Sequence, residues 1–243
     1  TKWVFDGTTL SAPTTIGDAT SLGRVLLADL NANGTVFALI ERPFAGERTQ
    51  VEVAVRNSAG NWALRPFELQ LSGVEFGGIA ANGNHVVVTG SGTSVNSARL
   101  GYQTAAWVST DGAKTFSLAD TRPLHSTAVD TQFGDVLVGA DGYYAAVCLD
   151  NGGAIRSGLA RSTDGTSWAE VPITAASELW PVSEGGCADI DVDAEGGVWI
   201  GGATTFYSLF FRVLNGTVDR IAAAEVTGTQ GPVTSGNRQL LRF

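Results

Sequence analysis

Turn glycines recur along this chain at a nearly constant spacing. Five of them are separated by steps of 53, 52, 53 and 51 residues. Each follows a short alternating or apolar run and precedes a second run of the same kind. A period of this length, with several strand-like runs in each unit, indicates a repeated structural unit. The five glycines are Gly7, Gly60, Gly112, Gly165 and Gly216.

A second series of turns lies within the same period. Its members are Asn33-Gly34, Asn82-Gly83, Asp141-Gly142, Glu195-Gly196-Gly197 and Ser235-Gly236-Asn237. Two hairpins in each unit correspond to four strands, which we label A to D, and such a unit of about 50 residues is typical of a propeller blade. The sequence therefore predicts an all-β, five-bladed β-propeller with four-stranded antiparallel blades, as a single domain over residues 1–243.

Each end of the chain carries half of a blade. Residues 226–234 and 239–243 are predicted to be an A and a B strand, whereas residues 1–5 and 8–12 are predicted to be a C and a D strand. We expect them to pair in one sheet, because this closes the ring and removes its free edges. The predicted blades are 226–243 plus 1–14, 18–70, 71–123, 124–176 and 177–224.

Other glycine-rich segments are interpreted as turns or strand ends. They are Gly77-Gly78 and Gly90-Ser91-Gly92.

The charge and the hydropathy of the chain argue against a nucleic-acid partner and a membrane span. The net charge is −9, and only two residues are lysine, so a phosphate backbone would be repelled and we expect no nucleic-acid partner. No apolar run approaches the roughly 18 residues that span a bilayer, so we expect no membrane span. The oligomeric state is left open.

Two features bear on the compartment. The sequence has no methionine and starts at Thr1, so we expect a processed or excised product, as a secreted protein is after it loses its signal peptide, and hence a secreted or extracellular protein. Its only cysteines are Cys148 and Cys187, which form either one disulfide in an oxidising compartment or two buried free thiols.

The C–D turns carry a recognisable motif. Ser109-Thr110-Asp111-Gly112-Ala113-Lys114-Thr115-Phe116 and Ser162-Thr163-Asp164-Gly165-Thr166-Ser167-Trp168 resemble the Asp-box, or BNR repeat, of sialidases and related propellers. The segments Asn57-Ser58-Ala59-Gly60-Asn61-Trp62 and Asn215-Gly216 are interpreted as degenerate copies, and Asp6-Gly7 keeps only the turn pair. In this motif the Asp caps backbone N–H groups and the Gly takes a positive φ, so its role is structural.

The resemblance also implies what a sialidase would need. Such enzymes are typically six-bladed and use an F-R-I-P-like motif, three arginines for the substrate carboxylate and a Tyr-Glu pair. The nearest fragment here, Glu41-Arg42-Pro43-Phe44, has the wrong order, and no arginine stands in a context that marks a triad. No hydrolytic triad, zinc or phosphate-loop pattern is present either, so we assign no catalytic residues and no cofactor.

Carboxylates near the inner strands leave an enzymatic alternative open. A glycoside hydrolase places a base and an acid on such strands, so a carboxylate site in the central channel is the rival interpretation. The candidates by position are Asp29, Glu75, Asp130, Asp135, Glu184 and Asp189.

Two short segments have the oxygen-ligand spacing of a calcium loop. They are Asp29-Leu30-Asn31-Ala32-Asn33-Gly34 and Asp189-Ile190-Asp191-Val192-Asp193. Neither is followed by the carboxylate that completes such a loop, so both are interpreted as hairpin turns and no metal site is assigned.

The remaining candidates lie in the B–C and D–A connections. These connections share one face of the disc and are the long, irregular ones, and loops on a rigid scaffold are where binding residues concentrate. Aromatic rings there provide platforms for sugars or proteins, and charged side chains orient polar groups. The predicted ligand-binding residues are Arg48, Arg99, Tyr102, His125, Trp180 and Glu184.

The favoured interpretation is a secreted, non-catalytic binding propeller that recognises a glycan or a protein surface through this face. The alternatives are the glycoside hydrolase described above and a scaffold domain of a longer surface protein.

Overall fold

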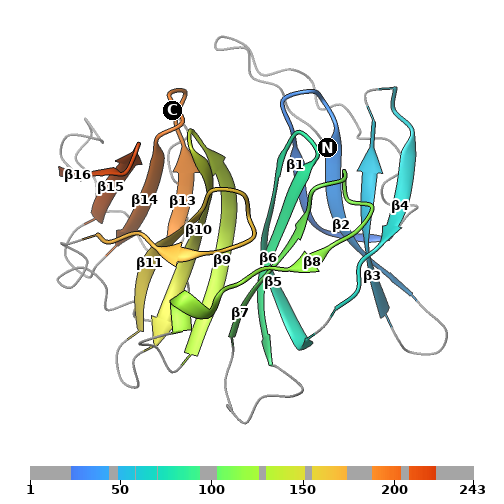
Figure 1. The fold of residues 1–243 in the computed structure, drawn as a ribbon, viewed down its shortest axis with the longest axis horizontal. Coiled ribbons are helices and arrows are strands. Elements are labelled where there is room, and N and C mark those ends of the chain that lie inside the picture. Colours follow the sequence, from blue (N-terminus) through green and yellow to red (C-terminus); the bar gives the residue numbers. More distant parts are fainter. Residues whose placement is uncertain are drawn as a thin grey trace.

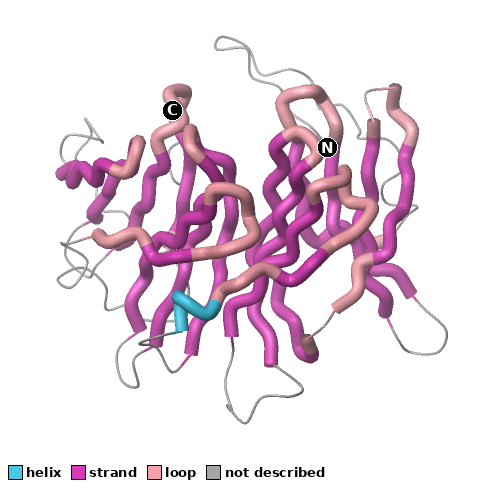
Figure 2. Tube along the Cα trace, in the orientation of Figure 1, coloured by secondary structure: helices cyan, strands magenta, loops and turns pink. Residues whose placement is uncertain are grey.

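The described part of the chain forms four antiparallel sheets, each with four strands in the order of the chain. The structure is a computed structural model that describes residues 23–43, 49–57, 59–69, 71–93, 103–125, 130–150, 155–173, 188–203 and 208–222. Within these residues the one helical element is a short 3-10 helix, and no helix is long and apolar enough to span a membrane (Figure 2).

Each sheet follows the A-B-C-D order that the two series of turns predict (Figure 1). The first sheet contains β1 (Arg24–Leu30), β2 (Val36–Pro43), β3 (Thr49–Arg56) and β4 (Trp62–Pro66). The second contains β5 (Ser72–Asn82), β6 (His85–Thr93), β7 (Gln103–Ser109) and β8 (Ser117–Leu118), and η1 (Arg122–His125) follows it. The third contains β9 (Asp130–Gly139), β10 (Gly142–Asp150), β11 (Ile155–Ser162) and β12 (Ala169–Glu170). The fourth contains β13 (Asp189–Val192), β14 (Val198–Ala203), β15 (Ser208–Leu214) and β16 (Thr217–Ala222).

The predicted all-β class and the four-stranded antiparallel unit are confirmed. The inner strands β1, β5, β9 and β13 contact one another in chain order, as in a propeller. The predicted fifth blade consists of terminal residues outside the described part of the chain. The number of five blades and the closure of the ring therefore stay predictions.

Consecutive sheets pack face to face through alternating residues. We call the face that packs on the next sheet in the chain the forward face, and the opposite one the backward face. Side chains on a strand alternate between the two faces, so each sheet contributes to two interfaces. The interfaces pair Phe37 and Leu39 with Val86 and Val88, Val87 and Val108 with Tyr143 and Ala145, and Tyr144 and Leu159 with Val198 and Phe211.

Buried hydroxyl groups link neighbouring sheets at these interfaces. The hydroxyl of Thr89 donates to the carbonyl of Gly134 at 3.1 Å, and the backbone N–H of Phe133 donates to Ser91 Oγ at 3.1 Å. Both side chains are buried, so these bonds satisfy polar groups that water does not reach. The interfaces are therefore specific in register as well as apolar.

The interpretation of Gly77-Gly78 as a turn or strand end is wrong. Both residues lie inside β5, where the pairing with β6 shifts register between Phe76 and Gly78. A Cβ built at Gly77 would lie 2.1 Å from the carbonyl oxygen of Gly134 in β9. The glycine is required because two inner backbones come into direct contact. Gly90 also lies within a strand, β6, and a Cβ there would be 2.7 Å from the carbonyl oxygen of Glu75.

Replacing Gly77 by Ala should therefore separate β5 from β9. We expect a loss of about 3 kcal/mol in unfolding free energy, at the upper end of the range for overpacked sites. Gly83→Ala is the matched control, because Gly83 has a φ of 60° but open space around its Cβ position. It should lose only about 1 kcal/mol from backbone strain. Urea denaturation measures both, and equal losses would contradict the close approach.

Candidate functional site

Most of the predicted ligand-binding residues lie outside the described part of the chain. These are Arg48, Arg99, Tyr102, Trp180 and Glu184. The backbone of His125 ends η1, but its side chain is also outside the description. The predicted binding site is therefore untested, and the described residues define only its surroundings.

The 3-10 helix η1 is fixed within the D–A connection from β8 to β9. Leu124 is buried and packs in the apolar cluster between the second and third sheets. Asp120 accepts two hydrogen bonds from the guanidinium of Arg122, at 2.8 Å each, and these bonds lower the pKa of Asp120 to about 2. The side chain of Arg122 is itself 88% exposed. The exposed guanidinium of Arg122 therefore lies on a connection that the buried side chain of Leu124 holds in place.

Further backbone bonds attach the same connection to the third sheet. The N–H of Asp120 donates to the carbonyl of Thr166 at 2.7 Å, and the N–H of Trp168 donates to the carbonyl of Asp120 at 3.0 Å. The segment between β8 and η1 is therefore tied to the C–D turn of the next sheet.

The candidate inner-strand carboxylates have different surroundings. Asp29 Oδ2 accepts the backbone N–H of Ala81 in the neighbouring sheet at 2.8 Å, so it connects two sheets. Glu75, Asp135 and Asp189 are exposed, and they lie on three successive inner strands. The side chain of Asp130 and all of Glu184 are outside the described ranges. Within those ranges, no group of three or more His, Cys, Asp or Glu residues lies close enough to hold a metal ion.

The two full Asp-box-like turns are closed by their own side chains. In the first, Asp111 Oδ1 accepts the N–H groups of Lys114 and Thr115 at 2.9 and 3.0 Å, and Ser109 Oγ accepts that of Ala113 at 2.9 Å. The bonds from the N–H and the hydroxyl of Thr115, with those from the Ser109 hydroxyl and the Lys114 N–H, hold the pKa of Asp111 well below its usual range. A carboxylate engaged in this way is a structural cap.

The second such turn adds a buried aromatic ring. Asp164 Oδ1 accepts the N–H and the hydroxyl of Thr166 at 2.9 and 2.7 Å, and the pKa of Asp164 is lowered by these bonds. Trp168 is fully buried, and its Nε1–H donates to the carbonyl of Gly165 at 2.9 Å. Gly112 and Gly165 have φ values of 74° and 85°, as the motif requires.

Three other turns share a different hydrogen-bond pattern that the sequence analysis missed. In each, the side-chain oxygen of the first residue accepts the N–H four residues later, at 2.9–3.0 Å. The backbone N–H of that first residue donates to the carbonyl of the same later residue. The first residues are Asn31, Asn57 and Asp193. The Asn57 turn, interpreted as a degenerate copy, shares the side-chain bond with the first Asp-box-like turn, where Ser109 Oγ accepts the N–H of Ala113, and differs from it in the backbone bond.

Both segments with calcium-loop spacing end in turns of this kind. Asn31 also donates its Nδ2–H to the carbonyl of Gly83 in the next sheet at 3.1 Å. The oxygen atoms that the spacing suggested as ligands are therefore engaged with backbone N–H groups in Asp29, Asn31 and Asp193.

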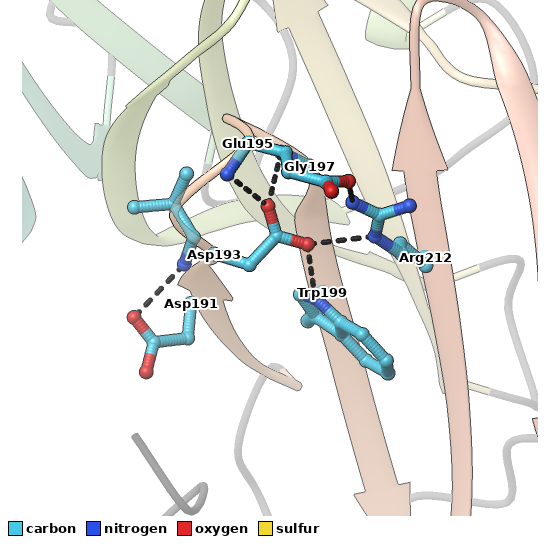
Figure 3. Close-up of polar contacts among 7 residues, drawn as sticks. Asp191, Asp193, Glu195, Gly197, Trp199 and Arg212 are labelled. Atoms are coloured by element: carbon cyan, nitrogen blue, oxygen red, sulfur yellow. Dashed lines mark hydrogen bonds and ion pairs between the residues drawn. The ribbon is translucent and has the colours of Figure 1, made fainter. Parts of the chain in front are cut away.

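Asp193 is the centre of the densest polar cluster near these turns (Figure 3). Its Oδ1 accepts the N–H groups of Glu195 and Gly197, both at 2.9 Å. Its Oδ2 accepts Trp199 Nε1–H at 2.9 Å and Arg212 Nε–H at 2.6 Å. The bond from Arg212 is the main cause that holds the pKa of Asp193 well below its usual range. Asp193 therefore stays ionised and is unsuited to act as a general acid.

A related cluster occupies the same strands of the preceding sheet. Tyr144 and Arg161 are partners in the pairing of β10 with β11, as Trp199 and Arg212 are in the pairing of β14 with β15. Asp141 accepts the hydroxyl of Tyr144 at 2.6 Å and Arg161 at 2.8 Å. Burial, followed by the hydrogen bond to Asp141, raises the pKa of Tyr144 to about 12. The sequence signal for such a cluster is an acidic residue in the A–B turn, followed by an aromatic residue on strand B and an arginine on strand C.

Cys148 lies near the end of β10 and is disulfide-bonded. The sequence contains one other cysteine, Cys187, which lies outside the described residues. Of the two states left open by the sequence, the structure contains the oxidised one.

Comparisons with known proteins agree with the fold. No family model and no curated protein sequence matches the chain. The structure is similar to the Trypanosoma rangeli sialidase in complex with the inhibitor DANA, with 15% identity, a TM-score of 0.51, and coverage of 83% of this chain and 38% of the sialidase. The same sialidase with 2,3-difluorosialic acid gives 15% identity, a TM-score of 0.52, and coverage of 82% and 37%. A Bombyx mori GH32 β-fructofuranosidase is 13% identical, with a TM-score of 0.45 and coverage of 78% and 46%.

At such identities the likeness to the sialidase concerns the fold alone. The chain has a sialidase-like β-propeller fold, and it spans less than half the length of these structures.

The Asp193 cluster predicts a stability difference that depends on pH. Asp193→Asn removes the charge that faces Arg212, and should lower the unfolding free energy at pH 7 by about 1.5–3 kcal/mol. Because the folded pKa is depressed, this contribution is complete above the unfolded value of about 3.9 and is lost as the pH falls towards the folded value. The gap between parent and variant should therefore be constant from about pH 5 to 7 and shrink below about pH 4.

Glu195→Gln provides the control within the same cluster. Glu195 binds Arg212 at 2.6 Å, but its side chain is 73% exposed, so the loss should stay below about 1 kcal/mol. Denaturation curves from pH 2.5 to 7 test both variants. A gap for Asp193→Asn that is as large at pH 2.5 as at pH 7 would contradict the ionic role.

Asp111→Ala and Asp164→Ala test the capping assignment. Each should lower the unfolding free energy by about 1–2 kcal/mol, as the loss of a cap does, and leave ligand binding per folded molecule unchanged. Lys114→Ala in the first turn is the control, since only its backbone N–H contacts Asp111. Loss of binding in a variant of normal stability would show that these aspartates contact the ligand.

Proposed function

We propose that this protein is a non-catalytic binding propeller whose ligand lies on the face formed by the B–C and D–A connections. The observation that carries the proposal is the difference between the two faces of the array. In five of the A–B and C–D turns, a side-chain oxygen of the turn accepts the turn's own backbone N–H groups. Because these side-chain oxygens already accept hydrogen bonds within their turns, few of them remain to bind a ligand.

The connections of the opposite face are longer. This holds for three of them, residues 94–102, 119–129 and 171–188, whereas 44–48, 67–71, 151–154 and 204–207 are as short as the A–B turns 31–35, 83–84, 140–141 and 193–197. Long connections on a rigid scaffold are where recognition residues concentrate. The anchored helix η1 and the exposed Arg122 supply one fixed part of this face.

The residues proposed to contact the ligand belong to these connections. Trp180 and Tyr102 would stack on an apolar surface, and Arg48, Arg99, His125 and Glu184 would bind polar groups. A glycan is the first ligand to test, since the fold is similar to that of a sialidase whose structures hold DANA and difluorosialic acid. A protein surface is the other ligand that such a face could recognise.

The site is proposed to function in a secreted or extracellular protein. The disulfide at Cys148 supports this, because such bonds persist mainly in oxidising compartments. The chain would act there alone or as the scaffold domain of a longer surface protein.

A glycoside hydrolase remains the second candidate for one specific reason. Glu75, Asp135 and Asp189 are exposed carboxylates on successive inner strands, and a paired acid and base on neighbouring strands is the arrangement that glycoside hydrolysis needs.

One pair of assays separates the two candidates. A glycan array measures binding, and a panel of chromogenic glycosides measures hydrolysis. Binding without turnover supports the first proposal. Turnover that is lost in Glu75→Gln, Asp135→Asn or Asp189→Asn supports the second and overturns the first.

Trp180 is the residue whose replacement best tests the proposed face. Trp180→Ala should cost about 1–3 kcal/mol of binding free energy, measured by calorimetry, with little change in melting temperature. Lys114→Ala, on the opposite face, should leave binding unchanged. If Trp180→Ala instead loses about 3–5 kcal/mol of stability, Trp180 is a packing residue and does not belong to the site.

A further inference from the structure

The tripeptide Asn-Gly-Thr occurs in two of the turns that the structure describes. Asn33-Gly34-Thr35 belongs to the A–B turn before β2, and Asn215-Gly216-Thr217 spans the C–D turn between β15 and β16. Asparagine followed two residues later by serine or threonine, with any residue except proline between them, is the acceptor pattern for N-linked glycans. The sequence contains no other segment with this pattern. Each copy is therefore a potential modification site.

The first copy presents its asparagine to solvent. Asn33 is exposed, and its Oδ1 accepts the backbone N–H of Thr35 at 3.0 Å. This bond orients the side-chain amide, and none of the described residues accepts a hydrogen bond from Asn33 Nδ2, the atom to which a sugar would be attached. A Cβ built at Gly34 would have no atom within 4 Å, so the turn has open space beside it.

The second copy has similar surroundings. Asn215 is exposed, and its φ of 50° places it in the left-handed region. A Cβ built at Gly216 would also have no atom within 4 Å. The C–D turn of the third sheet is different, because a Cβ at Gly165 would lie 2.6 Å from Val87 of the neighbouring sheet. The two turns with the acceptor pattern therefore have room for a bulky group.

Both turns lie on the same face of the array. In an antiparallel sheet with its strands in chain order, the A–B and C–D turns lie at one end and the B–C connection at the other. Hydrogen bonds also join the A–B ends of successive sheets. They run from Asn31 Nδ2 to the carbonyl of Gly83 at 3.1 Å, from the hydroxyl of Tyr143 to the carbonyl of His85 at 3.3 Å, and from the N–H of Ala140 to the carbonyl of Gly196 at 3.0 Å.

We propose that Asn33 and Asn215 carry N-linked glycans on the A–B and C–D face of the protein. The inference rests on the secreted location proposed above, because such glycans are added in the oxidising pathway in which the disulfide at Cys148 also forms. N-linked glycans are bulky and solubilising, so a face that carries two of them is unsuited to a protein interface. The opposite face, with the B–C and D–A connections, then remains open to the ligand.

The modification is a transfer of an oligosaccharide from a lipid diphosphate. A bond forms between the asparagine Nδ2 and C1 of the first sugar, and the bond between C1 and the diphosphate oxygen breaks. The lipid diphosphate leaves with the electron pair, and the amide nitrogen loses one proton to a base of the transferase. The transferase also recognises the hydroxyl two residues after the asparagine, so an exposed asparagine alone is not an acceptor.

Secretion from a eukaryotic cell tests both sites in the full chain. A cleavable signal peptide is added, so the result does not depend on the natural location of the protein. Treatment with peptide-N-glycosidase in heavy-oxygen water converts each glycosylated asparagine to an aspartate that contains heavy oxygen, and peptide mass spectrometry locates it. We expect the heavy oxygen at Asn33 and Asn215, and intact glycopeptides at the same two positions before the treatment.

Asn82 is the internal control for this experiment. It is an exposed residue that precedes Gly83 in an A–B turn, but the residue after this glycine is Asn84 in place of threonine. Asn-Gly pairs also deamidate without an enzyme, and this reaction would label Asn82 as well as Asn33. Asn82 should therefore remain without label and without a glycan.

Substitutions of the two threonines separate the acceptor pattern from the turn itself. Thr35→Val and Thr217→Val remove the hydroxyl that the transferase needs, and each should abolish the glycan at its own site only. Thr35→Val keeps the backbone N–H that bonds Asn33 Oδ1, so the turn should be retained. Thr35→Ser and Thr217→Ser keep the hydroxyl and should keep the glycan.

Two results would overturn the proposal. One is secreted, disulfide-bonded protein that has no glycan at either Asn33 or Asn215. The other is a label at Asn82 as strong as that at Asn33, which would identify deamidation as its source. Neither result depends on ligand binding. A glycan array without a bound ligand would therefore count against the proposed function and leave the two acceptor sites in place.

Discussion

Face-to-face packing between consecutive sheets is the constraint on which the rest of this structure depends. It determines which side of each strand is apolar, and it requires glycine at Gly77, where the backbone of β5 touches that of β9. It also explains the buried hydroxyls of Thr89 and Ser91, which satisfy backbone groups across an interface that excludes water. Residues of the connections and turns, such as Leu124 and Trp168, add to the same packing.

Aspartates satisfy backbone N–H groups in several turns of the A–B and C–D face. Asp111 and Asp193 use different hydrogen-bond patterns, yet each carboxylate accepts several donors and remains ionised. Asp193, which belongs to a segment with calcium-loop spacing, is therefore engaged in holding a turn. Under the proposed function, ligand contacts are expected in the B–C and D–A connections instead.

The sequence predicted the repeat well because its signals are local. The φ values of Gly60, Gly112, Gly165 and Gly216 lie between 74° and 88°, and each marks a C–D turn as expected. Contacts between residues distant in the sequence had no such signal. The meeting of Gly77 with Gly134, and of Asp193 with Arg212, depends on how sheets and strands are placed in space. The predicted ligand-binding residues belong to the least regular segments, where neither periodicity nor turn chemistry guides a prediction.

The bonds between Asp120 and the turn around Thr166 also bear on how the chain reaches its native state. They join units that are adjacent in sequence, as do the three apolar interfaces. Contacts of this kind require only short loops to close, so structure can begin in one pair of sheets and extend to the next. Because the backbones of β5 and β9 are in direct contact, we expect the second and third sheets to fold first and the first and fourth sheets to pack on them afterwards.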